Sequence, residues 1–243
     1  MYKKVEKRQR SAKHCGEVLL IGVEGAGKTL LCRHIDKISK GSSAPLQAAT
    51  QPSIGVEKLE VQHHSRFFTV REVGGIMQPV WHRYFEACAA VILVADASSI
   101  EGAAGAAVEL SNLLRTEALG QKPVLLLINK RDTRSAPPEL SIRMLMGLPA
   151  LERAAGARLC VVPGSALTGD GLTKVLDWCV VSCQAHQEMM DAVAAAAKAK
   201  AAKAAKAEAG GKSKSWGFGK LRKRNVDRKD GMVDDSTTPM PTK

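Results

Sequence analysis

A glycine-rich stretch near the start of the chain has the residue types and spacing that bind phosphate. It consists of eight consecutive residues: Gly22, Val23, Glu24, Gly25, Ala26, Gly27, Lys28 and Thr29. It lies between a predicted strand over residues 18–21 and a predicted helix over residues 28–38, which is the setting of a phosphate-binding loop. In such a loop, backbone N–H groups surround the α- and β-phosphates, Lys28 reaches the β- and γ-phosphates, and Thr29 offers a hydroxyl to Mg²⁺. Chance supplies roughly 0.02 such matches in a chain of this composition.

A second motif, Asn129-Lys130-Arg131-Asp132, directly follows the apolar run over residues 124–128. The Asp132 carboxylate can accept two hydrogen bonds from the N1 and N2 groups of guanine, which adenine cannot supply. Asn129 can tie this loop to the phosphate loop, and the stem of Lys130 can cover the base. The spacing arises by chance roughly 0.01 times. The two motifs together predict that the ligand is GTP or GDP rather than ATP.

Apolar runs alternate with helical patterns along the chain, and this alternation predicts the elements that position both motifs. We expect strands over residues 18–21, 56–62, 67–73, 91–95, 124–129 and 159–163, and helices over residues 28–38, 101–119, 139–155 and from 171 onward. Residues 63–65 should turn the second and third strands into a hairpin, and 39–51 should form a loop. The pattern predicts an open, mostly parallel α/β sheet with crossover helices.

With these motifs in place, the sequence resembles the Ras-like small GTPases, and more narrowly their Arf-like group, over residues 15–187. Pro52-Ser53-Ile54-Gly55 corresponds to switch I, and Glu72-Val73-Gly74-Gly75 corresponds to switch II. Ser165-Ala166-Leu167 corresponds to the guanine-facing loop. The resemblance implies the P-loop small GTPase fold, in which helices flank both faces of a six-stranded mixed sheet.

The resemblance also implies roles for these residues in a GTP/GDP switch. Ser53 and Glu72 would join Thr29 as Mg²⁺ ligands, Glu72 through water. Gly75 would donate its N–H to the γ-phosphate, and the Ala166 N–H would meet guanine O6. Both γ-phosphate-dependent contacts, at Ser53 and Gly75, end on hydrolysis and release the switch loops. Expected partners are effectors that bind the switch regions, an activator and an exchange factor, with the chain a monomer in membrane or ciliary traffic.

Two departures from the Arf-like pattern concern catalysis. Glu72 is one methylene longer than the usual aspartate, which bears on the Mg²⁺ geometry because that ion demands near-octahedral ligands. Ile76 stands where the group has the glutamine that orients the attacking water. We therefore assign no catalytic residue and expect very slow intrinsic hydrolysis. Gln78 is a weak candidate to replace that glutamine, and a solvated loop side chain is the favoured interpretation for it.

The net charge of +12 lies in the two ends of the 243-residue chain. Residues 1–12 carry +4 and residues 191–243 carry +7, so the segment between them is nearly neutral. This argues against a basic nucleic-acid-binding fold, and no specific nucleic-acid partner is expected. We predict a basic extension over residues 1–14, a GTPase domain over 15–190, an Ala/Lys-rich helix over 191–209 and a disordered basic tail over 210–243.

The chain shows no secretory signal, membrane span, myristoylation site or prenylation cysteine, so we expect a cytoplasmic protein. Six cysteines without a Cys-x-x-Cys pair favour reduced thiols, and packing is favoured over metal binding for Cys179 and Cys183. His63 and His64 are expected to be solvated. For the aromatic residues after switch II, Trp81, Tyr84 and Phe85, effector binding and core packing are equally supported.

The tail segment over residues 214–224 mixes aromatic and basic side chains, which suits an anionic membrane surface, nuclear entry or RNA contact. A solvated, nonspecific extension is the commonest outcome for such a segment, and peripheral membrane contact is favoured among the active roles. Two alternative functions stay open. One is an interaction module that is constitutively bound to GTP and does not hydrolyse it. The other is a GTPase that regulates a nucleic-acid-binding tail.

Overall fold

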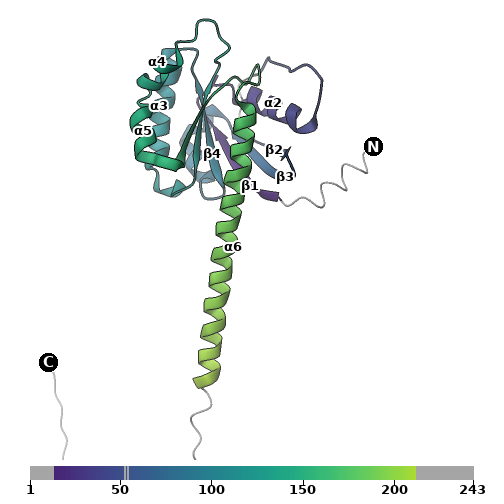
Figure 1. The fold of residues 1–243 in the computed structure, drawn as a ribbon, viewed down its shortest axis with the longest axis vertical. Helices are drawn as coiled ribbons and strands as arrows, with labels where there is room; N and C mark the ends of the chain where they lie inside the picture. The colour runs from purple at the N-terminus through teal and green to yellow at the C-terminus, as the bar shows by residue number, and fades with distance from the viewer. Residues whose placement is uncertain (1–13, 52, 54, 212–243) are drawn as a thin grey trace, which may run out of the picture. The chain divides into compact units, whose positions relative to one another are not determined.

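A six-stranded mixed sheet forms the centre of the protein in a computed structural model that describes residues 14–51, 53 and 55–211 (Figure 1). Its strands are β1 (His14–Ile21), β2 (Val56–His63), β3 (Arg66–Val73), β4 (Ala90–Asp96), β5 (Val124–Asn129) and β6 (Leu159–Pro163). They lie in the order β2-β3-β1-β4-β5-β6. Only β2 and β3 pair antiparallel among them, and they form the predicted hairpin. The predicted fold class is confirmed.

The helices connect the strands as the sequence pattern predicts, with two corrections. They are α2 (Lys28–Lys40), α3 (Ile100–Arg115), α4 (Glu139–Leu145), α5 (Leu148–Ala155) and α6 (Leu172–Gly211), with 3₁₀ turns η1 (Gly75–Tyr84), η2 (Glu117–Leu119) and η3 (Gly156–Arg158). The helix expected over residues 101–119 ends at Arg115, because Thr116 is extended, and a separate 3₁₀ turn follows over Glu117–Leu119. The single helix expected over residues 139–155 is wrong. Gly147 has φ 63°, in the left-handed region, so it ends α4 and α5 starts again with proline in its first turn.

Helices cover both faces of the sheet (Figure 1), and each face carries a layer of buried hydrophobic side chains. On one face, Val18 and Leu20 of β1 pack with α2 and α6. On the other, Leu19 and Ile21 pack with η1, α3, α4 and α5. Because successive side chains of a strand point to opposite faces, the uninterrupted apolar runs of β1, β4 and β5 fill both layers at once.

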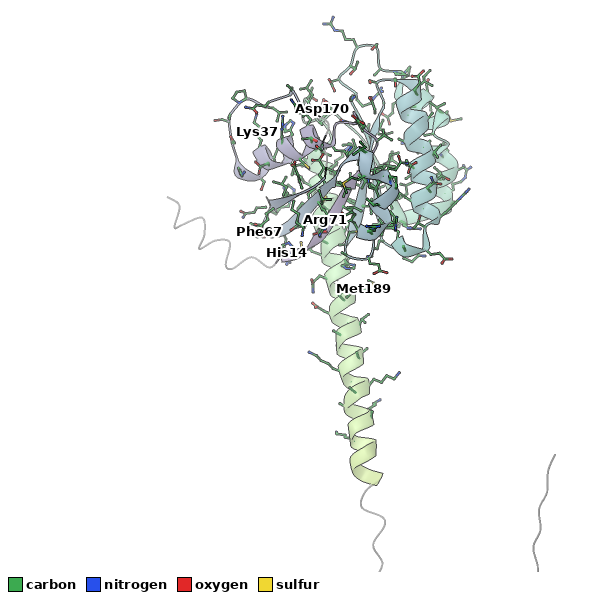
Figure 2. All side chains as sticks on the ribbon, turned by 180° about the vertical axis from the view of Figure 1, so that it is seen from behind. His14, Lys37, Phe67, Arg71, Asp170 and Met189 are labelled. Carbon is green, nitrogen blue, oxygen red and sulfur yellow. The ribbon has the colours of Figure 1, made fainter. Side chains whose placement is uncertain are left out.

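The carboxyl ends of the parallel strands lie together along one side of the sheet, which we call its carboxyl edge. Asp96, the last residue of β4, lies opposite Asn129, the last residue of β5. Figure 2 shows Asp170 at this end of the domain, whereas His14 and Phe67, near the starts of β1 and β3, lie at the other end. The loops that follow the strands therefore meet at the carboxyl edge, where ligands bind in open α/β sheets.

The aromatic residues after switch II belong to the core. Trp81 and Phe85 are 3% and 4% exposed, and Tyr84 packs against the same cluster. Of the two interpretations left open by the sequence, core packing is therefore the observed one. Cys179 and Cys183 are likewise buried core residues, and all six cysteines are free thiols.

The helix α6 continues into the second of two compact units, which begins at Ala197. Within that unit, the described residues 197–211 are helical. The predicted basic segments over residues 1–12 and 214–224 lie outside the described residues, so the four predicted segment boundaries stay a prediction. No helix in the described part of the chain is long and apolar enough to cross a membrane.

Candidate functional site

The glycine-rich loop lies between the end of β1 at Ile21 and the start of α2 at Lys28, as predicted. Gly27 has φ 96°, and a Cβ built on it would lie 2.5 Å from Asn129 Nδ2. Both the left-handed backbone and this close approach require glycine at the position. The chain thus enters α2 with its first backbone N–H groups directed at the loop, an arrangement that suits anions.

Lys28 is held inside this loop and is only 6% exposed. Its Nζ donates hydrogen bonds to the carbonyl oxygens of Gly22 at 2.8 Å and Val23 at 2.9 Å. Burial lowers the pKa of Lys28 below its usual value, while the carboxylates of Glu72 and Glu24 oppose part of that shift. A buried ammonium that already bends over the loop is well placed to bind phosphate oxygens.

A cavity of about 250 Å³ opens beside Lys28. Four parts of the chain line it: the phosphate loop with the start of α2, the segment that precedes β2, the strand β3, and the turn η1. The lining residues are Glu24, Gly25, Gly27, Lys28, Thr29, Thr50, Gln51, Ser53, Glu72, Gly75 and Ile76. The two predicted switch segments and the phosphate loop therefore share one cavity. Pro52 and Ile54, the other predicted switch I residues, lie outside the described residues.

Three oxygen-bearing side chains that line this cavity contact one another. Thr29 Oγ1 donates a hydrogen bond to Glu72 Oε1 at 2.6 Å, and it lies 2.8 Å from Ser53 Oγ. Glu72 is 2% exposed, and its buried Oε2 has no hydrogen-bond partner in the described structure. Two hydroxyls beside a carboxylate with a free buried oxygen form a donor set that fits a hard cation such as Mg²⁺. The extra methylene of Glu72 does not prevent this convergence.

Gly75 lies against the backbone of the phosphate loop. A Cβ built on Gly75 would overlap the backbone nitrogen of Glu24, so no larger residue fits there without moving the loop. Ile76, the next residue, lines the same cavity and is 66% exposed. The first residues of η1 therefore lie against the phosphate loop and form part of the same cavity wall.

Asn129 connects the second motif to the first. Its Nδ2 donates a hydrogen bond to the carbonyl of Ala26 at 2.7 Å, and its Oδ1 accepts one from the Ala166 N–H at 2.8 Å. Asn129 is 1% exposed, so both bonds are shielded from water. The Ala166 N–H, which the family resemblance assigns to guanine O6, thus donates to Asn129 in this structure.

The residues expected to contact guanine lie on the loops that follow β5 and β6. Ser165 is buried, and its hydroxyl donates a hydrogen bond to Asp132 Oδ1. Asp132 is exposed, which leaves its carboxylate free to accept from a ligand. Lys130 has φ 64°, and its Nζ lies 2.6 Å from Asp96 Oδ2, which fixes its aliphatic stem. Leu167 is 46% exposed beside them.

The Gln78 side chain is hydrogen-bonded to α3 in this arrangement. Its Nε2 donates a hydrogen bond to Glu109 Oε1 of α3 at 2.8 Å, and its side chain is exposed. It does not line the cavity that Ile76 lines. The structure therefore gives no support to Gln78 as a replacement for the missing glutamine.

Two residues that sequence reasoning missed hold the guanine-facing loops. His34 of α2 bonds the Ala166 carbonyl through Nδ1 at 2.8 Å. The Asp96 carboxylate accepts hydrogen bonds from the Lys130 ammonium and from the N–H and hydroxyl of Ser98. Asp96 follows an apolar strand just as Asn129 does, and this placement was the signal available in the sequence. His34 gives no such signal, because its contact spans 132 residues.

Comparison with known proteins agrees with this geometry. The sequence model of the ADP-ribosylation factor family matches residues 1–183. ADP-ribosylation factor-like protein 16 of Homo sapiens is 33% identical over 174 residues, which cover 69% of this chain and 85% of that protein. ADP-ribosylation factor-like protein 2 of Arabidopsis thaliana is 25% identical over 191 residues, covering 78% of this chain and 96% of that protein.

Among solved structures, the fold is similar to that of the Arl6 BBS3 small GTPase from Trypanosoma brucei with the bound nucleotide analogue GppNp. The TM-score is 0.57 at 21% sequence identity, and the match covers 70% of this chain and 98% of that chain. At this identity the likeness shows the fold alone, and the sequence matches carry the family. The chain belongs to the ADP-ribosylation factor family of small GTPases, which bind GTP and GDP and act as molecular switches.

Proposed function

We propose that this chain is a guanine-nucleotide switch with very slow intrinsic hydrolysis. The observation that carries the proposal is the shared cavity, in which Lys28 lies with Ser53 before β2 and Gly75 of η1. A γ-phosphate bound on the loop would contact both switch segments, and its loss would release them. The surface formed by the two switch segments would then have one conformation with GTP bound and another with GDP bound.

In the proposed complex, residues 22–29 bind the phosphates through backbone N–H groups, and Lys28 neutralises their charge. Asp132 accepts hydrogen bonds from guanine, while the Lys130 stem, Ser165, Ala166 and Leu167 enclose the base. Support comes from Asn129, which joins the two loops by buried hydrogen bonds before any ligand is bound. A site that is already connected in this way loses little conformational entropy on binding.

Mg²⁺ is the proposed metal, held by Thr29 and Ser53 and, through water, by Glu72. When bound, it neutralises charge on the β- and γ-phosphates. The unpartnered buried oxygen of Glu72 supports this assignment, because such an atom is costly to leave unpaired in an apolar interior. The Glu72 carboxylate accepts a hydrogen bond from the Thr29 hydroxyl, which leaves the lone pairs of that oxygen available to a cation.

Slow hydrolysis follows from Ile76. A side chain at this position of the cavity wall can exclude water, but an isoleucine has no donor or acceptor that could orient it. The groups needed for hydrolysis would have to come from an activating partner, as arginine fingers do in other GTPases. The proposed setting of the switch, membrane or ciliary traffic with effectors on the switch surface, rests on family membership alone.

A measurement of bound nucleotide and single-turnover hydrolysis tests the proposal. Purified full-length protein should release guanine nucleotide on denaturation, and preloaded GTP should be hydrolysed much more slowly than by a glutamine-bearing relative. GTP that exchanges for GDP in both directions supports a switch. GTP that neither exchanges nor turns over supports the alternative of a constitutively bound interaction module. Absence of guanine nucleotide binding would contradict both.

A further inference from the structure

Three metal-ligating side chains converge at the tip of the β2–β3 hairpin. His63 Nε2 lies 2.7 Å, and His64 Nε2 lies 3.1 Å, from the same oxygen, Oδ1 of Asp177 on α6. The three ligand atoms lie within 4.8 Å of one another. The expectation that both histidines are solvated is therefore wrong for His63, whose side chain is 13% exposed, whereas the His64 side chain is 69% exposed and also contacts Asp177.

The local backbone explains why two neighbouring histidines face one carboxylate. His63 pairs with Arg66 as the last residue pair of the hairpin, so His64 and Ser65 form the turn. His64 has φ 53°, in the left-handed region that a non-glycine residue seldom adopts. This turn breaks the alternation of a strand, which would otherwise send consecutive side chains to opposite faces. The two rings instead lie with centroids 4.1 Å apart.

The donor set matches a particular class of ion. Two imidazole nitrogens and one carboxylate oxygen suit Zn²⁺ and its neighbours in the first transition series, whereas Mg²⁺ prefers oxygen ligands alone. At Zn–ligand distances of about 2.0–2.1 Å, tetrahedral ligand atoms are roughly 3.3 Å apart. The two observed distances to Oδ1 are slightly shorter, so small side-chain rotations would admit the ion.

The surroundings leave room for the rest of the coordination sphere. The His64 and Asp177 side chains are 69% and 51% exposed, so water can reach the fourth position. The hydrogen bonds from His63 and His64 also lower the pKa of Asp177. A carboxylate that stays ionised is the form that binds metal.

We propose that His63, His64 and Asp177 bind one divalent transition-metal ion of the Zn²⁺ class, which crosslinks the β2–β3 hairpin to α6. This site is separate from the nucleotide cavity. The strand β2 begins three residues after Ser53, and β3 carries Glu72 near its other end. The ion therefore fixes the hairpin at the end opposite the Mg²⁺ and phosphate residues.

Zinc titration of the full-length protein, loaded with GDP and held in excess Mg²⁺, tests the proposal. We expect one Zn²⁺ to bind and to raise Tm, with the Kd at least tenfold higher in Asp177→Asn and in His64→Gly. Glycine suits the left-handed turn, so His64→Gly leaves the hairpin intact. His14→Ala, on β1, and Glu188→Gln, on α6, are matched controls outside the cluster and should bind zinc as the unsubstituted chain does.

Cobalt substitution distinguishes this site from the six cysteines. Co²⁺ at His63, His64 and Asp177 should give visible bands without a sulfur-to-metal charge-transfer band. Binding should also weaken strongly in acid, because only neutral histidine ligates metal. Equal zinc binding by all variants, no binding by the unsubstituted chain, or a thiolate band that persists in the variants would each overturn the proposal.

Discussion

Asn129 Nδ2 donates a hydrogen bond to the Ala26 carbonyl at 2.7 Å, across a sequence separation of 103 residues. The same side chain accepts a hydrogen bond from the Ala166 N–H through Oδ1, and its Nδ2 lies only 2.5 Å from the position of a Cβ built on Gly27. One buried amide thus connects the phosphate loop with both guanine-facing loops. The proposed base and phosphate sites are therefore joined by buried hydrogen bonds rather than lying on unconnected loops.

Asn129→Ala should destabilise the protein and weaken its binding of GDP. The substitution leaves the Ala26 carbonyl and the Ala166 N–H without their buried partners, and each such loss costs roughly 1–3 kcal/mol. We expect the free energy of unfolding to fall by about 2–4 kcal/mol. Urea denaturation of the nucleotide-free protein measures this loss separately from the effect on GDP affinity.

Asn112→Ala is the control for this substitution. Asn112 lies on the exposed side of α3, and surface changes of this kind usually stay within about 0.5 kcal/mol. A loss of stability in Asn129→Ala no larger than in Asn112→Ala would show that the amide does not connect the loops.

Glu72→Gln should remove the Mg²⁺ dependence of nucleotide release. The amide oxygen can still accept the Thr29 hydroxyl, so the local geometry is kept while the negative charge is lost. In the unsubstituted chain, Mg²⁺ should slow the release of a fluorescent GDP analogue. In Glu72→Gln we expect this protection to fall at least tenfold, which corresponds to about 1.4 kcal/mol of lost metal binding.

Glu57 provides a matched control for Glu72. It lies directly opposite Glu72 in the β2–β3 register, but it is exposed and does not line the phosphate cavity. Glu57→Gln should keep the full effect of Mg²⁺. If both variants respond to Mg²⁺ like the unsubstituted chain, Glu72 does not contribute to the metal site.

Ile76→Gln should increase intrinsic GTP hydrolysis. Residue 76 lines the cavity beside Lys28 and Gly75, so a glutamine there can orient a water molecule toward a bound γ-phosphate. We expect at least a tenfold rise in the single-turnover rate. Because Ile76 is 66% exposed, the substitution should change the unfolding free energy by less than about 0.5 kcal/mol.

Gln78→Ala tests whether the glutamine two residues after Ile76 contributes to hydrolysis. Gln78 bonds Glu109 on α3, so its removal should leave the hydrolysis rate unchanged. A lower rate in Gln78→Ala would mean that this side chain leaves Glu109 and enters the site. Unchanged hydrolysis in Ile76→Gln would show that more than this one position limits the reaction.

The parts of the site that could be predicted are those whose chemistry is local in the sequence. The phosphate loop and the Asn-Lys-x-Asp motif each need only adjacent residues and a preceding strand, and the strands had clear apolar patterns. The break at Gly147 was missed because one left-handed glycine outweighed a continuous helical pattern over residues 139–155.

Contacts between distant residues could not be predicted in the same way. His34 reaches Ala166, and His63 reaches Asp177, across more than 100 residues in each case. A histidine that caps a distant carbonyl has the same local sequence as one in solvent. Gln78 shows the converse, since its position in sequence is close to the site while its amide is held by α3.

Glu17 and Arg71 make the fold sensitive to acid. Arg71, on β3, donates two hydrogen bonds to the Glu17 carboxylate of β1, and Lys58 of β2 lies 3.4 Å from it. Arg71 also lies over the ring of Tyr84, 5.3 Å from its centroid. Burial alone would raise the pKa of Glu17, but Arg71 and Lys58 outweigh burial and lower it below the usual 4.5.

The sign of the pH effect follows from that lowered pKa. The stability contributed by Glu17 is fully present above the pKa of the unfolded chain and is lost as the pH falls through the lower pKa of the folded one. Glu17→Gln should therefore cost about 1–2 kcal/mol at pH 7, less than a fully buried charged pair would, and this difference should shrink below about pH 4.5. Urea denaturation from pH 7 to pH 3.5 measures it, with the exposed Glu60→Gln on β2 as the control. A difference that stays constant over this range would mean that packing, and not the charge on Glu17, holds β1 to β3.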